Sequence, residues 1–150
     1  MFGLSWAGLA VALTILAPSF LLIPWPARNA PSPLPKVGVA LAALERIGQV
    51  GTLVLATVIV GEPGHPAWLG MVLVAVLAYY GLWVRYFARG REFSALYAPL
   101  GPLPVPMAVF PVLAFLAAAG WLGNPWLAGA AIILAAGHIP ASLRIAAAAR

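Results

Sequence analysis

The chain contains 150 residues, of which 64% are hydrophobic and 7% are charged, and its net charge is +5. Residues 1–27 and 93–143 contain no Asp, Glu, Lys or Arg. In water such long apolar runs would form a surface that aggregates, which excludes a soluble globular domain, whereas a bilayer requires them because a charge at its centre costs several kcal/mol.

Apolar segments follow one another along the chain, and each is long enough to cross a hydrocarbon core of about 30 Å. Their boundaries fall at Pro- and Gly-rich turns, which interrupt helices. The predicted spans are residues 2–23, 37–61, 67–88, 105–122 and 126–143. Residues 93–97 have apolar side chains at helical spacing and are expected to form a short interfacial segment before the fourth span. The expected fold is an all-α bundle of five transmembrane helices, forming one integral membrane domain over residues 1–150.

The basic residues predict the orientation of this bundle. Arg28 and Lys36 lie in the first connection, and Arg89 and Arg91 lie in the third, whereas the second and fourth connections contain no Lys or Arg. Cytoplasmic loops carry the excess of positive charge, so the N-terminus is expected outside and the C-terminus in the cytoplasm. The six Trp residues fall near predicted span ends, as in an aromatic belt. The Arg-, Ala- and Gly-rich composition indicates a bacterial cytoplasmic (inner) membrane.

The number and orientation of these spans resemble those of the tryptophan-rich sensory protein family. The resemblance is limited to this plan, and it therefore implies no site residue.

Polar side chains gather at one depth of the predicted bundle. Counting about 1.5 Å per residue from the outer turns places His138 about 18 Å deep, Glu45 about 24 Å deep and Arg85 about 26 Å deep. Ionisable groups inside a membrane usually face the protein interior and pair, so we expect a polar cluster in the cytoplasmic third of the bilayer. Its predicted ligand-binding residues are Glu45, Arg46, Gln49, Tyr79, Trp83, Arg85, Tyr86, His138, Ser142 and Arg144.

The predicted cluster carries more positive than negative charge. Glu45 supplies one carboxylate, and Arg46, Arg85 and Arg144 supply up to three guanidinium groups. Arg is the planar, bidentate partner of carboxylate and phosphate. The leading hypothesis is a protein that binds or translocates an amphipathic, anionic small molecule or lipid through a polar layer open to the cytoplasm.

Two other functions fit the same sequence. An intramembrane enzyme acting on a lipid head group would use Glu45 or His138 as its catalytic acid or base, and Arg side chains would stabilise a phosphate. An accessory or structural subunit of a larger membrane complex would need packing surfaces instead. Gly129, Ile133 and Gly137 form a smooth Gly/Ala face on the fifth span that suits a partner helix or a homodimer.

Purely structural roles also remain open for several of these residues. Arg85 and Arg144 could extend to the interface as anchors. Glu45 and Arg46 are adjacent and point about 100° apart on a helix, so they need not pair. Gln49 could join two helices, and the lone histidine of the fifth span could be a packing residue.

The sequence predicts no cofactor and no metal site. The chain contains no cysteine, which excludes disulfides and thiolate ligands. Glu62 and His65, in an outer turn, supply only two ligands, fewer than a zinc site needs. The expected partners are the lipid bilayer and an amphipathic anion or lipid, and no nucleic acid.

Overall fold

The apolar runs fold into helices separated by the Pro- and Gly-rich connections. The computed structural model describes residues 1–148. Its helices are α1 (Trp6–Phe20), α2 (Val39–Val58), α3 (Ala67–Ala88), α4 (Phe93–Leu96), α5 (Pro106–Trp121) and α6 (Pro125–Ala148). Extended pairing within these 148 residues is limited to isolated bridges. The prediction of an all-α fold is confirmed.

Helix length divides the bundle into two groups. Helices α2, α3 and α6 have 20, 22 and 24 residues and are long and apolar enough to cross a membrane. Helices α1 and α5 are also apolar but have only 15 and 16 residues. The predicted span 67–88 coincides with α3, and the short segment before the fourth span contains α4, a single helical turn.

Residues 2–5 and 59–61, expected at the ends of the first two spans, are not helical. The N-terminal segment instead pairs with the end of α2 and the residues after it: the Gly3 amide donates to the Val58 carbonyl at 3.0 Å, and the Val60 amide donates to the Met1 carbonyl at 2.9 Å. Helix α1 begins late because the Ser5 hydroxyl accepts a hydrogen bond from the Gly8 amide at 3.1 Å, as an N-cap does. Helix α6 continues beyond residue 143 to Ala148, because alanine favours the helix most.

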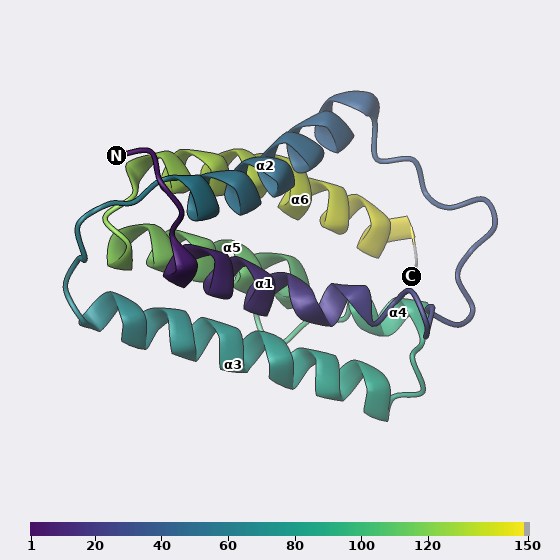
Figure 1. Ribbon diagram of the computed structural model, residues 1–150. Coiled ribbons are helices and arrows are strands. Elements are labelled where there is room, and N and C mark those ends of the chain that lie inside the picture. Colours follow the sequence, from purple (N-terminus) through teal and green to yellow (C-terminus); the bar gives the residue numbers. More distant parts are fainter. Residues whose placement is uncertain (149–150) are drawn as a thin grey trace.

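Helix α5 lies at the centre of the bundle, and most of its side chains are buried (Figure 1). It packs against α3 and α6, and α2 packs along α6. Helix α1 lies on α2 and touches α3 and α5 at only a few positions. The N-terminus and the α2–α3 and α5–α6 turns lie at one end, and connections 21–38 and 89–105 lie at the other (Figure 1).

Two glycines allow α2 and α6 to approach closely. A Cβ atom added to Gly48 would collide with the backbone of Leu134, and one added to Gly137 would collide with the backbone of Glu45. Small residues at a helix interface let backbones meet in this way. The contact fixes the relative rotation of α2 and α6, which matters because each helix carries one member of the ionisable pair described below.

Asn124 joins the C-terminal end of α2 to the N-terminal end of α6. Its side-chain amide donates to the Leu55 carbonyl at 2.8 Å, its oxygen accepts from the Leu127 amide at 3.0 Å, and the residue is 1% exposed. We expect Asn124→Ala to lower the free energy of unfolding by about 1–3 kcal/mol, because it removes a helix cap and leaves buried groups without partners.

Asn124→Ser provides the matched control for this prediction. Serine keeps an N-cap acceptor for α6 but cannot reach the Leu55 carbonyl in the same way, so it should lose less stability than alanine. Unfolding in detergent micelles, followed by circular dichroism, measures both. Equal stability of the alanine variant and the unsubstituted chain would contradict the joining role of Asn124.

Candidate functional site

An ionisable pair joins α2 to α6. Nδ1 of His138 lies 2.7 Å from Oε1 of Glu45, and the two side chains are 26% and 25% exposed. This is the distance of a charge-assisted hydrogen bond, which a carboxylate accepts from an imidazole N–H. Because the carboxylate holds Nδ1, the ring is oriented and Nε2 is the nitrogen left to exchange a proton.

The pair lies in the wall of a cavity of about 170 Å³ between the helices. Helices α1, α2, α3, α5 and α6 all contribute to this wall, together with the segment around α4. The polar and aromatic side chains that line it are Ser19, Glu45, Tyr79, Trp83, Tyr97, His138 and Ser142. We call this space the Glu45–His138 cavity.

The structure brings five of the predicted site residues to this cavity. Glu45 comes from α2, Tyr79 and Trp83 come from α3, and His138 and Ser142 come from α6. Ser142 follows His138 by four residues, so both side chains lie on the same face of α6. The remaining wall is apolar, and the cavity therefore combines one acid–base pair with hydroxyl groups and aromatic rings.

Tyr86 lies outside the cavity lining. It is fully buried next to Trp83, and the centroids of the two rings are 5.5 Å apart at an angle of 81°. Edge-to-face packing of this kind stabilises aromatic clusters. Tyr86 therefore supports the Trp83 ring from behind.

The three predicted guanidinium groups do not line the cavity either. Arg85 donates to the carbonyls of Ala98 and Pro99 at 2.9 and 3.1 Å, and Arg144 donates to the Val37 carbonyl at 2.7 Å. Arg46 is exposed beside an outer groove on α2. The hydrogen bonds of Arg85 and Arg144 hold connecting segments against helix ends.

Gln49 is exposed, although it stands one turn from Glu45. The buried face of α2 instead follows Gly48, Thr52 and Ala56, which pack toward the interior. Helix rotation is set by the close contact at Gly48, and that contact turns Gln49 outward. Of the two predicted site residues, Glu45 and Gln49, only Glu45 lines the cavity.

Tyr97 also lines the cavity, although the sequence predicted it only as part of a short interfacial segment. It follows α4 and lines the cavity near Glu45. Burial, and to a lesser degree the negative charge of Glu45, raise the pKa of the Tyr97 phenol. Tyr97 therefore stays neutral and can donate a hydrogen bond. The helical spacing of apolar residues at 93–97 was the signal that this segment packs inward.

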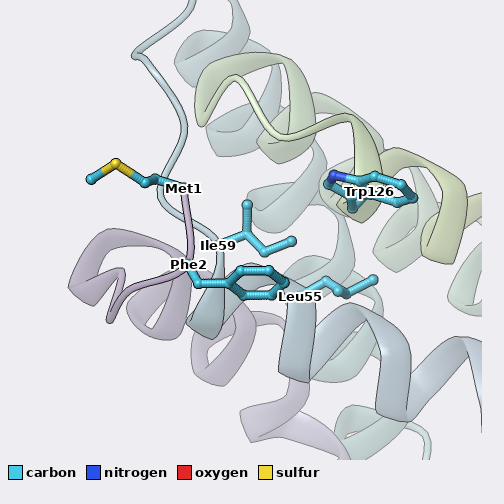
Figure 2. Close-up of a pocket in the computed structure, with 5 residues that line it drawn as sticks. All are labelled: Met1, Phe2, Leu55, Ile59 and Trp126. Carbon is cyan, nitrogen blue, oxygen red and sulfur yellow. The ribbon is translucent and has the colours of Figure 1, made fainter.

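A second, apolar pocket of about 300 Å³ lies at the other end of the bundle. Figure 2 shows Phe2, Leu55, Ile59 and Trp126 around it, and Met1 completes the lining. These side chains offer no acid, base or charged group. The pocket can accommodate hydrocarbon, and its lining side chains offer no acid or base to a polar ligand.

Metal binding needs more ligands than the site supplies. Residues 1–148 contain no group of three or more His, Cys, Asp or Glu side chains that could hold a metal ion. Glu45 and His138 provide two, whereas a zinc site uses at least three protein ligands. The pair is suited to moving or holding a proton.

Comparison of the chain with protein-family models, with curated proteins and with solved structures found no match. The site must therefore be interpreted from its own geometry.

Proposed function

We propose that this chain is a five-span membrane protein of the bacterial inner membrane that binds or translocates a small amphipathic molecule at the Glu45–His138 cavity. Its N-terminus would face outside and its C-terminus the cytoplasm. The hydrogen-bonded Glu45–His138 pair in the cavity wall carries this proposal. Ionisable residues are costly inside a membrane and are usually kept there for function.

The outer surface of the bundle supports insertion in a bilayer. Large apolar side chains on its outer faces are exposed, among them Ile47, Val74, Leu77, Val84 and Ile132. In water, large exposed apolar patches of this kind would promote aggregation. Helix α1 is extended by further helical turns, since the amides of Leu21, Leu22 and Ile23 donate to carbonyls three residues earlier, so α1 can span together with these turns.

The distribution of charge supports the proposed orientation. Connections 21–38 and 89–105 lie at the same end of the bundle and contain Arg28, Lys36, Arg89 and Arg91 (Figure 1). These two connections are joined to each other, because the Asn29 side chain donates to the Glu92 carboxylate at 2.9 Å. A basic end of this kind faces the cytoplasm.

The cavity favours a neutral or cationic ligand over the anion expected from the sequence. Among the described residues that line it, Glu45 and His138 are the only acidic or basic side chains. With no Lys or Arg in this lining, the only basic side chain that an anion would meet is His138, which the Glu45 carboxylate already holds. The ligand that fits has an amine or hydroxyl group for the pair and an apolar part for the aromatic wall.

The same pair supports an enzyme as the second candidate. His138 is oriented by a carboxylate through Nδ1, and the Ser142 hydroxyl lines the same cavity one helical turn away. A base oriented by a third group beside a hydroxyl is the arrangement used in nucleophilic catalysis. On this alternative Glu45→Gln abolishes turnover of a lipid head group while binding survives.

Homodimer formation through the face at Gly129 and Gly137 is restricted by the fold. Gly137 packs on the backbone of Glu45 within the chain, so this part of the face is already covered. Gly129 has open space beside it. A contact with a second copy through this face would therefore use the part of α6 around Gly129.

Native mass spectrometry of protein extracted gently from membranes tests the proposed function. We expect a small adduct on the unsubstituted chain, and Glu45→Gln should reduce its occupancy about tenfold, since loss of one charged hydrogen bond costs about 1.5–3 kcal/mol. Arg46→Ala is the matched control, because it removes a neighbouring charge from the exposed face. A chain that carries no adduct and arrives only with another protein would contradict the proposal and favour the accessory-subunit role.

A further inference from the structure

Two spaces lie on opposite sides of the contact between α1 and α3. On the inner side is the Glu45–His138 cavity, to which α1 contributes Ser19 and the turn after it contributes Leu22. On the outer side is a groove of about 500 Å³ that is lined by α3 and by α1 with the turn after it. Its walls include Ala17 from α1, Leu21 from that turn, and Val84 and Phe87 from α3. We call the contact between these two helices the α1–α3 seam.

The Trp83 side chain belongs to the walls of both spaces. It is 5% exposed, and its Nε1 atom has no hydrogen-bond partner among the described residues. A buried N–H without a partner costs free energy comparable to a lost hydrogen bond. One indole ring thus separates the polar cavity from the outer groove, and it carries a donor that a ligand passing between them could use.

The α1–α3 seam is held by few interactions. Helix α1 touches α3 at only a few positions, whereas α3 and α5 pack along their length. Ser19 Oγ lies 3.3 Å from the Tyr79 hydroxyl, and the Tyr80 hydroxyl donates to the Thr14 carbonyl at 2.8 Å. Pro18 explains the second bond: it has no N–H to offer the carbonyl four residues earlier, so that carbonyl is free for Tyr80.

The sizes of the two spaces complement each other. The cavity is smaller than the roughly 300–1,000 Å³ of typical ligand pockets, and the outer groove alone falls within that range. The cavity can therefore hold a polar head group, and the groove can hold an aliphatic chain. This division suits a ligand with one polar head group and one aliphatic chain.

We propose that the Glu45–His138 cavity opens sideways to the bilayer through the α1–α3 seam, with Trp83 as its gate, and admits a single-chain amphipathic amine. The amine would lie against the Glu45 carboxylate and the rings of Tyr79 and Trp83, which attract cations. The chain would lie in the outer groove. This inference rests on the proposed function, because it names the ligand class and the route to the same cavity.

The absence of cysteine allows the route to be tested directly. Ser142→Cys places a single thiol in the cavity wall. In phosphatidylcholine nanodiscs, this thiol is alkylated by N-dodecylmaleimide dissolved in the bilayer, or it is converted to a mixed disulfide, with release of methanesulfinate, by a water-soluble methanethiosulfonate cation. We expect Ala17→Trp, which fills the outer groove, to slow alkylation by N-dodecylmaleimide about tenfold, equivalent to about 1.4 kcal/mol of barrier, without slowing the water-soluble reagent.

Two further variants keep this test decisive. Val74→Trp adds the same side chain to an exposed position on α3 outside the groove and should leave both rates unchanged. Trp83→Ala removes the gate and should accelerate N-dodecylmaleimide selectively. Equal rates for Ala17→Trp and Val74→Trp would overturn the sideways route, and so would an equal acceleration of both reagents by Trp83→Ala, which would indicate general loosening.

Binding of dodecylamine to the chain with Ser142 intact separates this inference from the proposed function. We expect Glu45→Gln and Ala17→Trp each to weaken dodecylamine binding about tenfold. Binding of butylamine, which has only a short chain, should respond to Glu45→Gln alone. Unchanged dodecylamine binding in Glu45→Gln would overturn the proposed function and the amine class together. If Glu45→Gln weakens both amines and Ala17→Trp weakens neither, the function stands and the sideways route fails.

Discussion

Gly137→Leu is expected to separate α2 from α6 and to remove most of the stability of the bundle. The first side-chain carbon would occupy the same space as the Glu45 backbone, and backbone cannot move aside as a flexible side chain can. Overpacking usually costs about 1–3 kcal/mol, and a clash with backbone should reach or exceed the upper end of that range. The substitution also displaces the helix that carries His138.

Gly129→Leu on the same helix provides the matched control. Its added side chain meets open space, so the change should be nearly neutral or slightly stabilising through better helix propensity. Thermal unfolding in detergent, followed by circular dichroism, compares the two variants with the unsubstituted chain. If both leucine variants melt together, the close approach of α2 and α6 is not what holds the bundle.

A double-mutant cycle on Glu45 and His138 is expected to show a coupling energy of about 1–3 kcal/mol, within the range found for residues in direct contact. The 2.7 Å contact supplies the coupling, and the partial exposure of both side chains keeps it below the cost of breaking a fully buried pair. The double variant should lose less stability than the sum of the two single variants, because Glu45→Ala alone leaves the His138 imidazole without its partner.

The control cycle pairs Arg46→Ala with His138→Ala. Arg46 neighbours Glu45 in sequence but is exposed on the outer face of α2. Its effect and that of His138 should add within about 0.5 kcal/mol. A coupling energy near zero for Glu45 and His138, or an equal coupling in both cycles, would contradict the pair as a specific contact.

The polar layer shows how far sequence reasoning reached. The sequence predicted that Glu45 and His138 share one polar layer, and the structure brings these two residues, 93 positions apart in sequence, into contact across α2 and α6. Depth alone could not distinguish Arg85 and Arg144, which lie near helix ends and bind carbonyls of neighbouring segments. Long flexible side chains reach to whichever acceptor is nearest, and the spacing of residues does not encode that choice.

The helix ends show a second limit. Hydropathy extended the first two spans through residues 2–5 and 59–61, which are apolar. The N-terminal residues instead pair with the end of α2 and the residue after it, through a bridge between Phe2 and Ile59 and a hydrogen bond of 2.7 Å from the Ser5 amide to the Thr57 carbonyl. Hydropathy is a local property and could not predict this pairing. The pairing joins segments more than 50 positions apart and depends on where α1 lies against α2.

The sequence by itself determined that this protein is a bundle of apolar helices with its basic residues at one end, because hydropathy and charge are local properties of the chain. The tertiary structure alone decided which polar groups meet. Contacts at Gly48 and Gly137 set the rotation of α2 against α6, bring Glu45 to His138 and turn Arg46 and Gln49 outward. Helix rotation depends on packing between distant residues, and no local pattern specifies it.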